Sequence, residues 1–430
     1  MFAAKYTLAG VAEWVKGFGG LNVSENGYSI AVDSTGVYVA GRYQSPPPAG
    51  VLDLGNGVTL PVSSFSGDSF LVRYNLAGVA QWATSIGGGG SVCYAVAADS
   101  TGVYVTGRYG ISSNLGNGVT LPGAELGTSG VLFVVKYNSS GVAQWAKTST
   151  GQNSNTIGLA IVVDSTSVYV TGSYVSTPGI NLGSGVTLPT TSGQQDAFVV
   201  KYTLAGVTQW ATTIVGTSSD AGNGITVDST GVYVTGNYTS ISTVSLGNSV
   251  TLPISVGSQD LFVIKYDLAG VAQWAKAIGS TGTDIGHGIA VDSTGVYVTG
   301  IKSTSTSINL GNGVTIVTSG GCIVKYDLAG VAQWAKGGVG TSGSGISVSS
   351  TGVYVTGYYQ SSSFSLGNGV TLPTPTAFRN GFVVKYDLTG VAQWAKTVKG
   401  TGSGEVHRIV VDSTNVYVSG YYSSSSAVIL

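Results

Sequence analysis

The two histidines of the chain are the side chains best suited to acid–base chemistry near neutral pH. His287 and His407 stand at the same place in a repeating pattern, five residues before the aspartate of a recurring turn. We interpret this place either as the lining of a ligand pocket, with histidine as a proton donor, or as a solvated position that is free to vary. The residues at this place are Tyr28, Tyr94, Leu159, Asn223, His287, Ser344 and His407.

The turn aspartates are the second group that could do chemistry, as one metal ligand per repeat. One repeat has Ser349 in place of the aspartate. Serine makes the same local turn hydrogen bond but is a poor ligand for a hard cation. We therefore interpret the aspartates as turn caps and expect neither a metal site nor a cofactor. These residues are Asp33, Asp99, Asp164, Asp228, Asp292 and Asp412.

Tyrosines that follow polar residues form the third group, as in Arg42-Tyr43 and Arg108-Tyr109. Aromatic faces beside adaptable hydrogen-bonding groups suit a glycan or a peptide, although a tyrosine also ends a strand well. If a site exists, we expect it where the last repeat meets the first, at Glu25, Tyr28, Arg42, Glu405, His407 and Arg408. The candidate binding residues are Tyr28, Arg42, Tyr43, Tyr94, Arg108, His287, His407 and Arg408.

Four short segments of strand-like sequence must position these residues, and they recur about every 60 to 68 residues. The first resembles Gly288 to Asp292, the second is Val-Tyr-Val-Thr-Gly, and the third resembles Phe382 to Tyr386. The fourth is Val-Ala-Gln-Trp-Ala-Lys or a close variant, and it holds every tryptophan of the chain. We expect each tryptophan to dock on the neighbouring repeat, burying roughly 150–250 Å². They are Trp14, Trp82, Trp145, Trp210, Trp274, Trp334 and Trp394.

Tight links join the first segment to the second and the third to the fourth, which favours antiparallel hairpins. The other two links are longer and more varied, so they should lie at the opposite rim. Seven sets of four antiparallel strands without a helical period predict an all-β, seven-bladed β-propeller. A solenoid is the alternative, but it needs atypical capping repeats, and the sequence contains none.

The two ends of the chain complement each other. The chain opens with a third and a fourth segment (2–16) and finishes with a first and a second (407–422), which together predict the seventh blade. We expect one domain over 1–430 and a monomer; pairing of the split blade between two molecules is the alternative. The expected blades are 24–84, 91–147, 156–212, 221–276, 285–336, 342–396, and 405–430 with 1–16.

The composition excludes several classes of function. Only 9% of residues are charged and the formal net charge is −1, which argues against nucleic-acid binding and a polybasic membrane surface. No run of eighteen apolar residues exists, so we expect no membrane span. Cys93 and Cys322 stand at different places in the repeat, so we expect neither a disulfide nor a thiolate metal site. No signal peptide is expected in this sequence.

The basic residues divide into two groups. Twelve of the 18 stand at repeated places in the third and fourth segments, where we expect ion pairs or side chains that reach solvent at blade edges. The other six lie on the variable side of the repeat or at the start of an inner strand. They are Arg42, Arg108, Lys302, Arg379, Lys399 and Arg408.

The string GIAVDSTGVYVTG, followed later by FVVKYDLAGVAQWAK, resembles the bacterial seven-bladed propeller repeats of the SBBP type, and the likeness covers essentially the whole chain. The resemblance implies a propeller in bacterial proteins that are often exported or surface-attached, without a settled activity. From this resemblance we expect the protein to lie outside the cell or on its surface. The Asp-x-x-Gly followed by Trp is also similar to the docking repeat of quinoprotein-type propellers, which implies a structural role for the tryptophan.

We expect a non-catalytic interaction or scaffold module whose partner is a glycan or a protein. The sequence contains no nucleophile-and-base arrangement, no metal-ligand cluster and no phosphate loop. One alternative is a propeller lyase or hydrolase that uses His287 or His407 with Arg408. Another is a spacer without a specific ligand. Because Leu430 aligns with the start of a recurring Leu-Gly-Asn-Gly segment, we also expect the chain to be part of a longer protein.

Overall fold

The computed structural model describes residues 1–19, 24–45, 50–64, 66–125, 128–152, 154–191, 194–360, 362–398 and 402–423. All regular structure in these ranges is β. Seven four-stranded antiparallel sheets and six two-stranded hairpins account for it. This is the predicted seven-bladed β-propeller of four-stranded blades, and the N-terminal and C-terminal strands together form one blade, β2-β1-β40-β39.

Each blade is named by its position along the chain and runs from its first to its fourth strand. The first blade is β3 (Ser24–Val32), β4 (Val37–Gln44), β7 (Asp68–Tyr74) and β8 (Ala80–Ile86), and the second is β9 (Val92–Asp99), β10 (Gly102–Tyr109), β13 (Val131–Tyr137) and β14 (Ala143–Thr148). The third is β15 (Ser154–Val163), β16 (Ser167–Ser176), β19 (Asp196–Thr203) and β20 (Thr208–Ile214), and the fourth is β21 (Ala221–Asp228), β22 (Gly231–Tyr238), β25 (Asp260–Tyr266) and β26 (Ala272–Ile278). The fifth is β27 (Asp284–Asp292), β28 (Gly295–Lys302), β31 (Gly320–Tyr326) and β32 (Ala332–Gly337), the sixth is β33 (Ser342–Ser349), β34 (Gly352–Tyr359), β37 (Asn380–Tyr386) and β38 (Ala392–Val398), and the seventh is β39 (Gly404–Val411), β40 (Asn415–Tyr422), β1 (Phe2–Thr7) and β2 (Ala12–Gly17).

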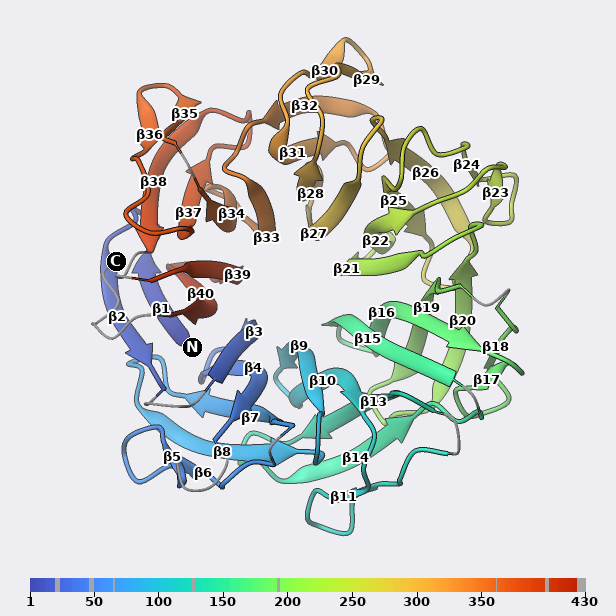
Figure 1. The fold of residues 1–430 in the computed structure, drawn as a ribbon, viewed down its shortest axis with the longest axis vertical. Helices are drawn as coiled ribbons and strands as arrows, with labels where there is room; N and C mark the ends of the chain where they lie inside the picture. Colours follow the sequence, from blue (N-terminus) through green and yellow to red (C-terminus); the bar gives the residue numbers. More distant parts are fainter. Residues whose placement is uncertain are drawn as a thin grey trace. The chain divides into compact units, whose positions relative to one another are not determined.

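The chain divides into two compact units, which are described separately. The first unit is Met1–Ala3 with Lys16–Thr213, and the second is Ala4–Val15 with Ile214–Leu430. Within the second unit, β27 lies between β21 and β33, and β33 lies between β27 and β39 (Figure 1). Within the first unit, β9 lies between β3 and β15. First strands therefore line the inner side of each unit. The expected seventh blade includes residues 424–430, which lie outside the described residues.

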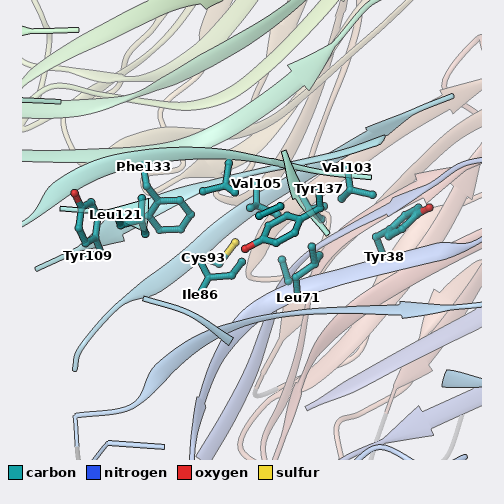
Figure 2. Packing of buried hydrophobic residues seen from close by; sticks show 14 of the residues in the cluster. Tyr38, Leu71, Ile86, Cys93, Val103, Val105, Tyr109, Leu121, Phe133 and Tyr137 are labelled. Atoms are coloured by element: carbon teal, nitrogen blue, oxygen red, sulfur yellow. The ribbon is translucent and has the colours of Figure 1, made fainter. Parts of the chain in front are cut away.

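Buried aromatic and aliphatic side chains fill the space between neighbouring blades. Figure 2 shows the cluster between the first and second blades, where Tyr38 and Leu71 of one blade meet Val103 and Tyr137 of the next. Cys93 lies within this cluster and, like Cys322, is a free, buried cysteine. Second and third strands are buried on both faces, which explains their continuous apolar runs. No helix in the described part of the chain is long and apolar enough to cross a membrane.

The turn aspartates cap the link between the first and second strands. In the third blade, Asp164 Oδ1 accepts hydrogen bonds from the main-chain N–H of Thr166 at 2.7 Å and of Ser167 at 2.8 Å. Its Oδ2 accepts one from the Tyr169 hydroxyl at 3.1 Å. Burial raises the pKa of Asp164, but these hydrogen bonds outweigh it and hold the pKa below its usual value. Ser349 makes a weaker version of the same turn, accepting from Thr351 N at 3.2 Å.

The Leu-Gly-Asn-Gly segments form small hairpins beside the fourth strands, which are the outer edges of the blades. Asn368 stands at φ 51°, the left-handed region that this tight turn needs. Its side-chain amide donates to the main-chain oxygen of Ala392 in β38 at 2.9 Å. The unpaired edge of an outer strand can pair with another chain. Each hairpin lies beside such an edge and helps to block this pairing. The hairpins are β5 (Leu52–Asp53) and β6 (Thr59–Leu60), β11 (Ser113–Asn114) and β12 (Thr120–Leu121), β17 (Ile180–Asn181) and β18 (Thr187–Leu188), β23 (Val244–Ser245) and β24 (Thr251–Leu252), β29 (Ile308–Gly311) and β30 (Val314–Ile316), and β35 (Phe364–Gly367) and β36 (Val370–Leu372).

Candidate functional site

A β-bulge interrupts the first strand of every blade at the place that carries the histidines. In β27, Gly286 pairs with Gly300 and Gly288 pairs with Thr299, so His287 between them has no partner on β28. An extra residue of this kind bends the strand and re-aims its side chain. The same interruption occurs at Tyr28, Tyr94, Leu159, Asn223, Ser344 and His407.

The bulge explains the glycine that ends the Val-Tyr-Val-Thr-Gly segment. A Cβ on Gly107 would lie 1.9 Å from the main-chain oxygen of Val92. A Cβ on Gly300 would lie 2.0 Å from the main-chain oxygen of Ile285. Only glycine tolerates so close an approach of the backbone. The glycine that recurs in this segment is the sequence feature that corresponds to the bulge. The sequence alone did not predict a bulge from it.

In the second unit, two bulge side chains bind the neighbouring blade. Asn223 Nδ2 donates to the main-chain oxygen of Gly286 at 3.0 Å. His287 Nδ1 donates in the same way to the main-chain oxygen of Gly343 at 2.8 Å. Burial lowers the pKa of His287, this hydrogen bond opposes the shift, and the Arg408 charge adds to it. The imidazole is consequently neutral near pH 7 and acts as an interblade donor.

Arg408 follows the bulge residue of β39, and its side chain reaches the first strands of other blades. Its guanidinium donates to the main-chain oxygens of Ser344 at 2.9 Å, His287 at 3.3 Å and Asn223 at 3.3 Å. These three acceptors belong to the sixth, fifth and fourth blades. The structure thus brings Arg408 to the backbone of His287, both predicted site residues.

A second cluster lies at the variable end of the sixth and seventh blades. The Arg379 guanidinium forms an ion pair with Glu405 Oε1, and His407 Nε2 lies 3.6 Å from the other oxygen of that carboxylate. Burial raises the pKa of Glu405, but His407 and Arg379 outweigh it and hold the pKa below its usual value. Glu405 is therefore a stable anion between two basic groups.

Aromatic rings surround this ion pair. The Arg379 guanidinium lies 4.5 Å from the Tyr358 ring centroid and 5.6 Å from that of Phe378. The His407 ring lies 5.5 Å from that of Tyr421. Phe378 is 71% exposed, whereas the Arg379 side chain is 34% exposed. A stacked, partly desolvated guanidinium beside an exposed ring is an arrangement found at binding surfaces.

Arg379 was one of the six basic residues outside the repeated places, but the sequence did not indicate its role. The sequence feature that could have indicated this role is a change of residue type, because Arg379 is charged where the equivalent residues of five other blades are uncharged. These residues are Gly67, Gly130, Gln195, Gln259 and Ser319. Lys399, another of the six, lies outside the described residues.

The first unit holds the other candidate residues. The rings of Tyr28 and Tyr94 lie 5.7 Å apart at 41°. Burial raises the pKa of Tyr28 and Tyr94 adds to the shift, while Arg42 and Arg108 oppose it. Tyr43, by contrast, is fully buried against Phe70, so its ring packs in the core. The predicted gathering of Tyr28 and Arg42 with His407 spans both units and stays a prediction.

At the opposite rim, the repeated lysines of the third strands pack on tyrosines of the second strands. Lys325 Nζ lies 5.0 Å from the Tyr297 ring centroid and donates to Thr294 Oγ1 at 3.0 Å. Lys136 is placed in the same way over Tyr104. Lys5 forms the expected kind of ion pair, with Glu13 at 2.7 Å. Each of these contacts joins neighbouring strands within a single blade.

The fifth blade departs from the repeat in its core. Five blades pair a buried second-strand tyrosine with a third-strand phenylalanine, with ring centroids 6.2–6.5 Å apart. The fifth blade has Lys302 and Cys322 at these places. Lys302 is fully buried and donates to the main-chain oxygen of Thr304 at 2.5 Å. Burial lowers the pKa of Lys302, while Asp284 and Cys322 oppose the shift.

Within the described residues, no group of three or more His, Cys, Asp or Glu side chains is placed to hold a metal ion. The candidate site of the second unit combines the ion pair of Arg379 and Glu405 with the rings of Tyr358 and Tyr421. Such a surface can bind a ligand by stacking and hydrogen bonding.

No protein-family model matches the chain. It is similar to an uncharacterized WD repeat-containing protein, L264, of Acanthamoeba polyphaga mimivirus, with 26% identity over 272 residues. The alignment covers 51% of this chain and 19% of that protein, so the chain spans about a fifth of its relative's length. Together with the seven sheets, this likeness supports a propeller repeat protein whose scaffold resembles those of WD-repeat proteins.

Proposed function

We propose that this propeller is a non-catalytic interaction module that binds a glycan or a peptide at the variable end of its sixth and seventh blades. The observation that carries the proposal is the Arg379 cluster. Glu405 fixes the guanidinium and Tyr358 stacks against it, so its remaining donors are held in place before a ligand arrives. Preorganisation of this kind lowers the entropic cost of binding.

The repeats differ from one another where this cluster lies. The two tight turns of the opposite rim keep the same length and closely similar residues along the chain, as Asp-Ser-Thr-Gly or Asp-Leu-Ala-Gly and their variants, whereas the longer links and bulge side chains vary more. A rigid frame with varied loops at one rim suits recognition. The proposed partner is therefore a ligand that contacts side chains of adjacent blades.

An enzymatic role has less support. His287 donates from Nδ1 to a main-chain carbonyl, and Arg408 donates to three others. Both side chains thereby hold neighbouring blades together. A lyase or hydrolase would need them near a substrate.

The SBBP-type resemblance supports two further parts of the proposal. We propose that the repeats belong to that bacterial type and that the protein lies outside the cell or on its surface. We also propose a monomer, because the closing sheet joins strands from both ends of one chain. Light scattering that shows a dimer would contradict the last point.

A glycan and peptide array probed with the purified chain tests the proposed function. Arg379→Ala and Phe378→Ala should each weaken a hit at least about tenfold, a loss of about 1.4 kcal/mol. Lys336→Ala removes the same charge from the fourth strand of the fifth blade and should leave the hit unchanged. A hit that survives Arg379→Ala, or an array without any hit, would argue against this site; the empty array would favour a spacer.

A further inference from the structure

The bulge residues of the first strands have no partner in the register of the sheet. Asn223, His287 and Ser344 are the unpaired bulge residues of β21, β27 and β33, which lie side by side in the second unit. An interrupted ladder leaves polar main-chain groups without their usual partners. Such groups need another donor when they are buried.

Arg408 supplies that donor to all three. Nη1 donates to the oxygens of Ser344 and His287, and Nη2 donates to that of Asn223. A guanidinium carries five N–H groups in one plane with a spread charge, so it can bind several carbonyls at once. Each acceptor comes from a different blade. The contact consequently links the seventh blade to the three blades before it.

The repeat shows that Arg408 is specific to the seventh blade. The equivalent position in the other six blades carries a small residue. A Cβ on one of these, Gly345, would lie 3.1 Å from the Arg408 Cα. The six equivalent residues are Ser29, Ala95, Ala160, Gly224, Gly288 and Gly345.

The guanidinium of Arg408 lies among main-chain carbonyl oxygens. Among the described residues, no carboxylate forms an ion pair with Arg408. Burial lowers its pKa. The partial negative charges of the three carbonyls therefore help to stabilise the cation.

We propose that the main-chain oxygens of Asn223, His287 and Ser344 form a guanidinium-binding site, which Arg408 fills from within the same chain as a brace between four blades. The site is distinct from the Arg379 cluster and needs no external ligand. Its selectivity follows from shape and charge. A planar cation fits three carbonyls from three strands, whereas a neutral molecule of the same shape lacks the charge.

Chemical rescue of Arg408→Ala tests the site. The variant should melt at least about 3 °C below the natural chain. Guanidinium chloride below about 20 mM, where its denaturing effect is negligible, should raise the melting temperature of the variant along a saturating curve. Urea has the same shape without the charge and should not. The natural chain, with its site filled, should not respond to guanidinium.

The matched control is Lys336→Ala, which removes a cation from the fourth strand of the fifth blade in the same unit, leaves no guanidinium-shaped site, and should show no rescue. An Arg408→Ala protein that is as stable as the natural chain, or that guanidinium and urea affect alike, would overturn the proposal. If the variant is recovered unfolded, its refolding yield is measured instead. A yield that guanidinium raises and urea does not supports the site, and a yield that neither raises counts against it.

Discussion

The indole nitrogen of Trp334 lies 3.0 Å from the main-chain oxygen of Leu388 and donates a hydrogen bond to it. Leu388 belongs to the tight turn between the third and fourth strands of the next blade. A Cβ on Gly390 in that turn would lie 3.0 Å from the Trp334 ring. The tryptophan thus binds its neighbour with one hydrogen bond and one ring face. Equivalent hydrogen bonds join Trp82 to Ser139, Trp145 to Leu204, Trp274 to Leu328 and Trp394 to Leu8.

Substitution of Trp334 should separate the two parts of this contact. Trp334→Phe keeps most of the ring and loses the hydrogen bond, which should lower the free energy of unfolding by about 1 kcal/mol. Trp334→Ala also loses the packing of a half-buried ring and should lower it by about 2 to 3 kcal/mol. Urea unfolding followed by tyrosine fluorescence and circular dichroism measures both. Gln333→Ala, at the exposed neighbouring residue, is the control and should change the free energy of unfolding by less than about 0.5 kcal/mol. Equal losses for Trp334→Phe and Trp334→Ala would show that ring packing adds nothing to the hydrogen bond.

The sequence predicted the architecture because the repeated residues are those that build it. The tryptophan hexapeptide, the tight turns and the complementary chain ends each predicted a packing contact or a strand pairing. The bulge escaped prediction because strand periodicity assumes a regular ladder. A single inserted residue changes which face every later side chain occupies. With the bulge in place, His287 reaches the next blade and donates to Gly343.

The Arg379 cluster could be predicted only in part for a different reason. Glu405 and His407 were expected at one site, where the last repeat meets the first. Arg379 comes from a variable link between β36 and β37, and no periodic pattern fixes where such a link lies. Contacts that depend on loop conformation are set by packing and are not encoded in strand spacing.

The sixth blade offers a direct test of the turn aspartates, because it has Ser349 instead. Ser349→Asp should recreate the acceptors that Asp164 provides to two main-chain N–H groups and a tyrosine hydroxyl. We expect the free energy of unfolding to rise by about 1 kcal/mol at pH 7. Thermal and chemical denaturation of the two proteins measures the difference; a destabilised variant would contradict it.

This gain should depend on pH with a definite sign. The folded pKa of the equivalent residues Asp164 and Asp412 lies below the usual value, because hydrogen bonds outweigh burial. A carboxylate with a lowered folded pKa stabilises the protein fully above its unfolded pKa of about 3.9, and the contribution is lost as the pH falls through the folded pKa. Ser349→Asn keeps a side-chain oxygen without the titration and should show no such loss. Unfolding curves between pH 7 and about 2.5 compare the two variants over this window.

In the third blade, the hydrogen bond between the hairpin and the fourth strand has its donor on the fourth strand instead of on the hairpin. The other hairpins donate from an asparagine to the fourth strand, as Asn368 does to Ala392. Here Ser184 stands at the asparagine position, and Thr208 Oγ1 donates from the fourth strand to the main-chain oxygen of Leu182 at 2.6 Å. In this blade the fourth strand therefore supplies the donor, and the acceptor is Leu182, two residues before the asparagine position.

A double-mutant cycle on this pair should therefore show coupling. Thr208→Ala alone removes a buried hydrogen bond and should lower the free energy of unfolding by about 1 kcal/mol. Ser184→Asn in the Thr208→Ala background should restore most of that loss, and should add little when Thr208 is present. Equilibrium urea unfolding of the four proteins measures the coupling energy. Additive effects within about 0.3 kcal/mol would show that the two contacts are independent.

The fifth blade leads to the last prediction, since Lys302 and Cys322 occupy places where other blades have tyrosine and phenylalanine. Cys322→Phe alone adds a large ring beside the buried Lys302 side chain and should lower the free energy of unfolding by about 1 to 3 kcal/mol. Lys302→Tyr alone removes a buried amine whose pKa burial lowers, but it leaves the tyrosine without its ring partner. The double variant recreates the edge-to-face pair that Tyr238 makes with Phe262 at 6.5 Å and should be more stable than the sum of the single changes by at least about 1 kcal/mol. As a control, Lys302→Tyr is combined with Ser349→Asp, a substitution in another blade, and these two effects should be additive. Coupling that appears only between Lys302→Tyr and Cys322→Phe would identify the packing of the two side chains as its cause.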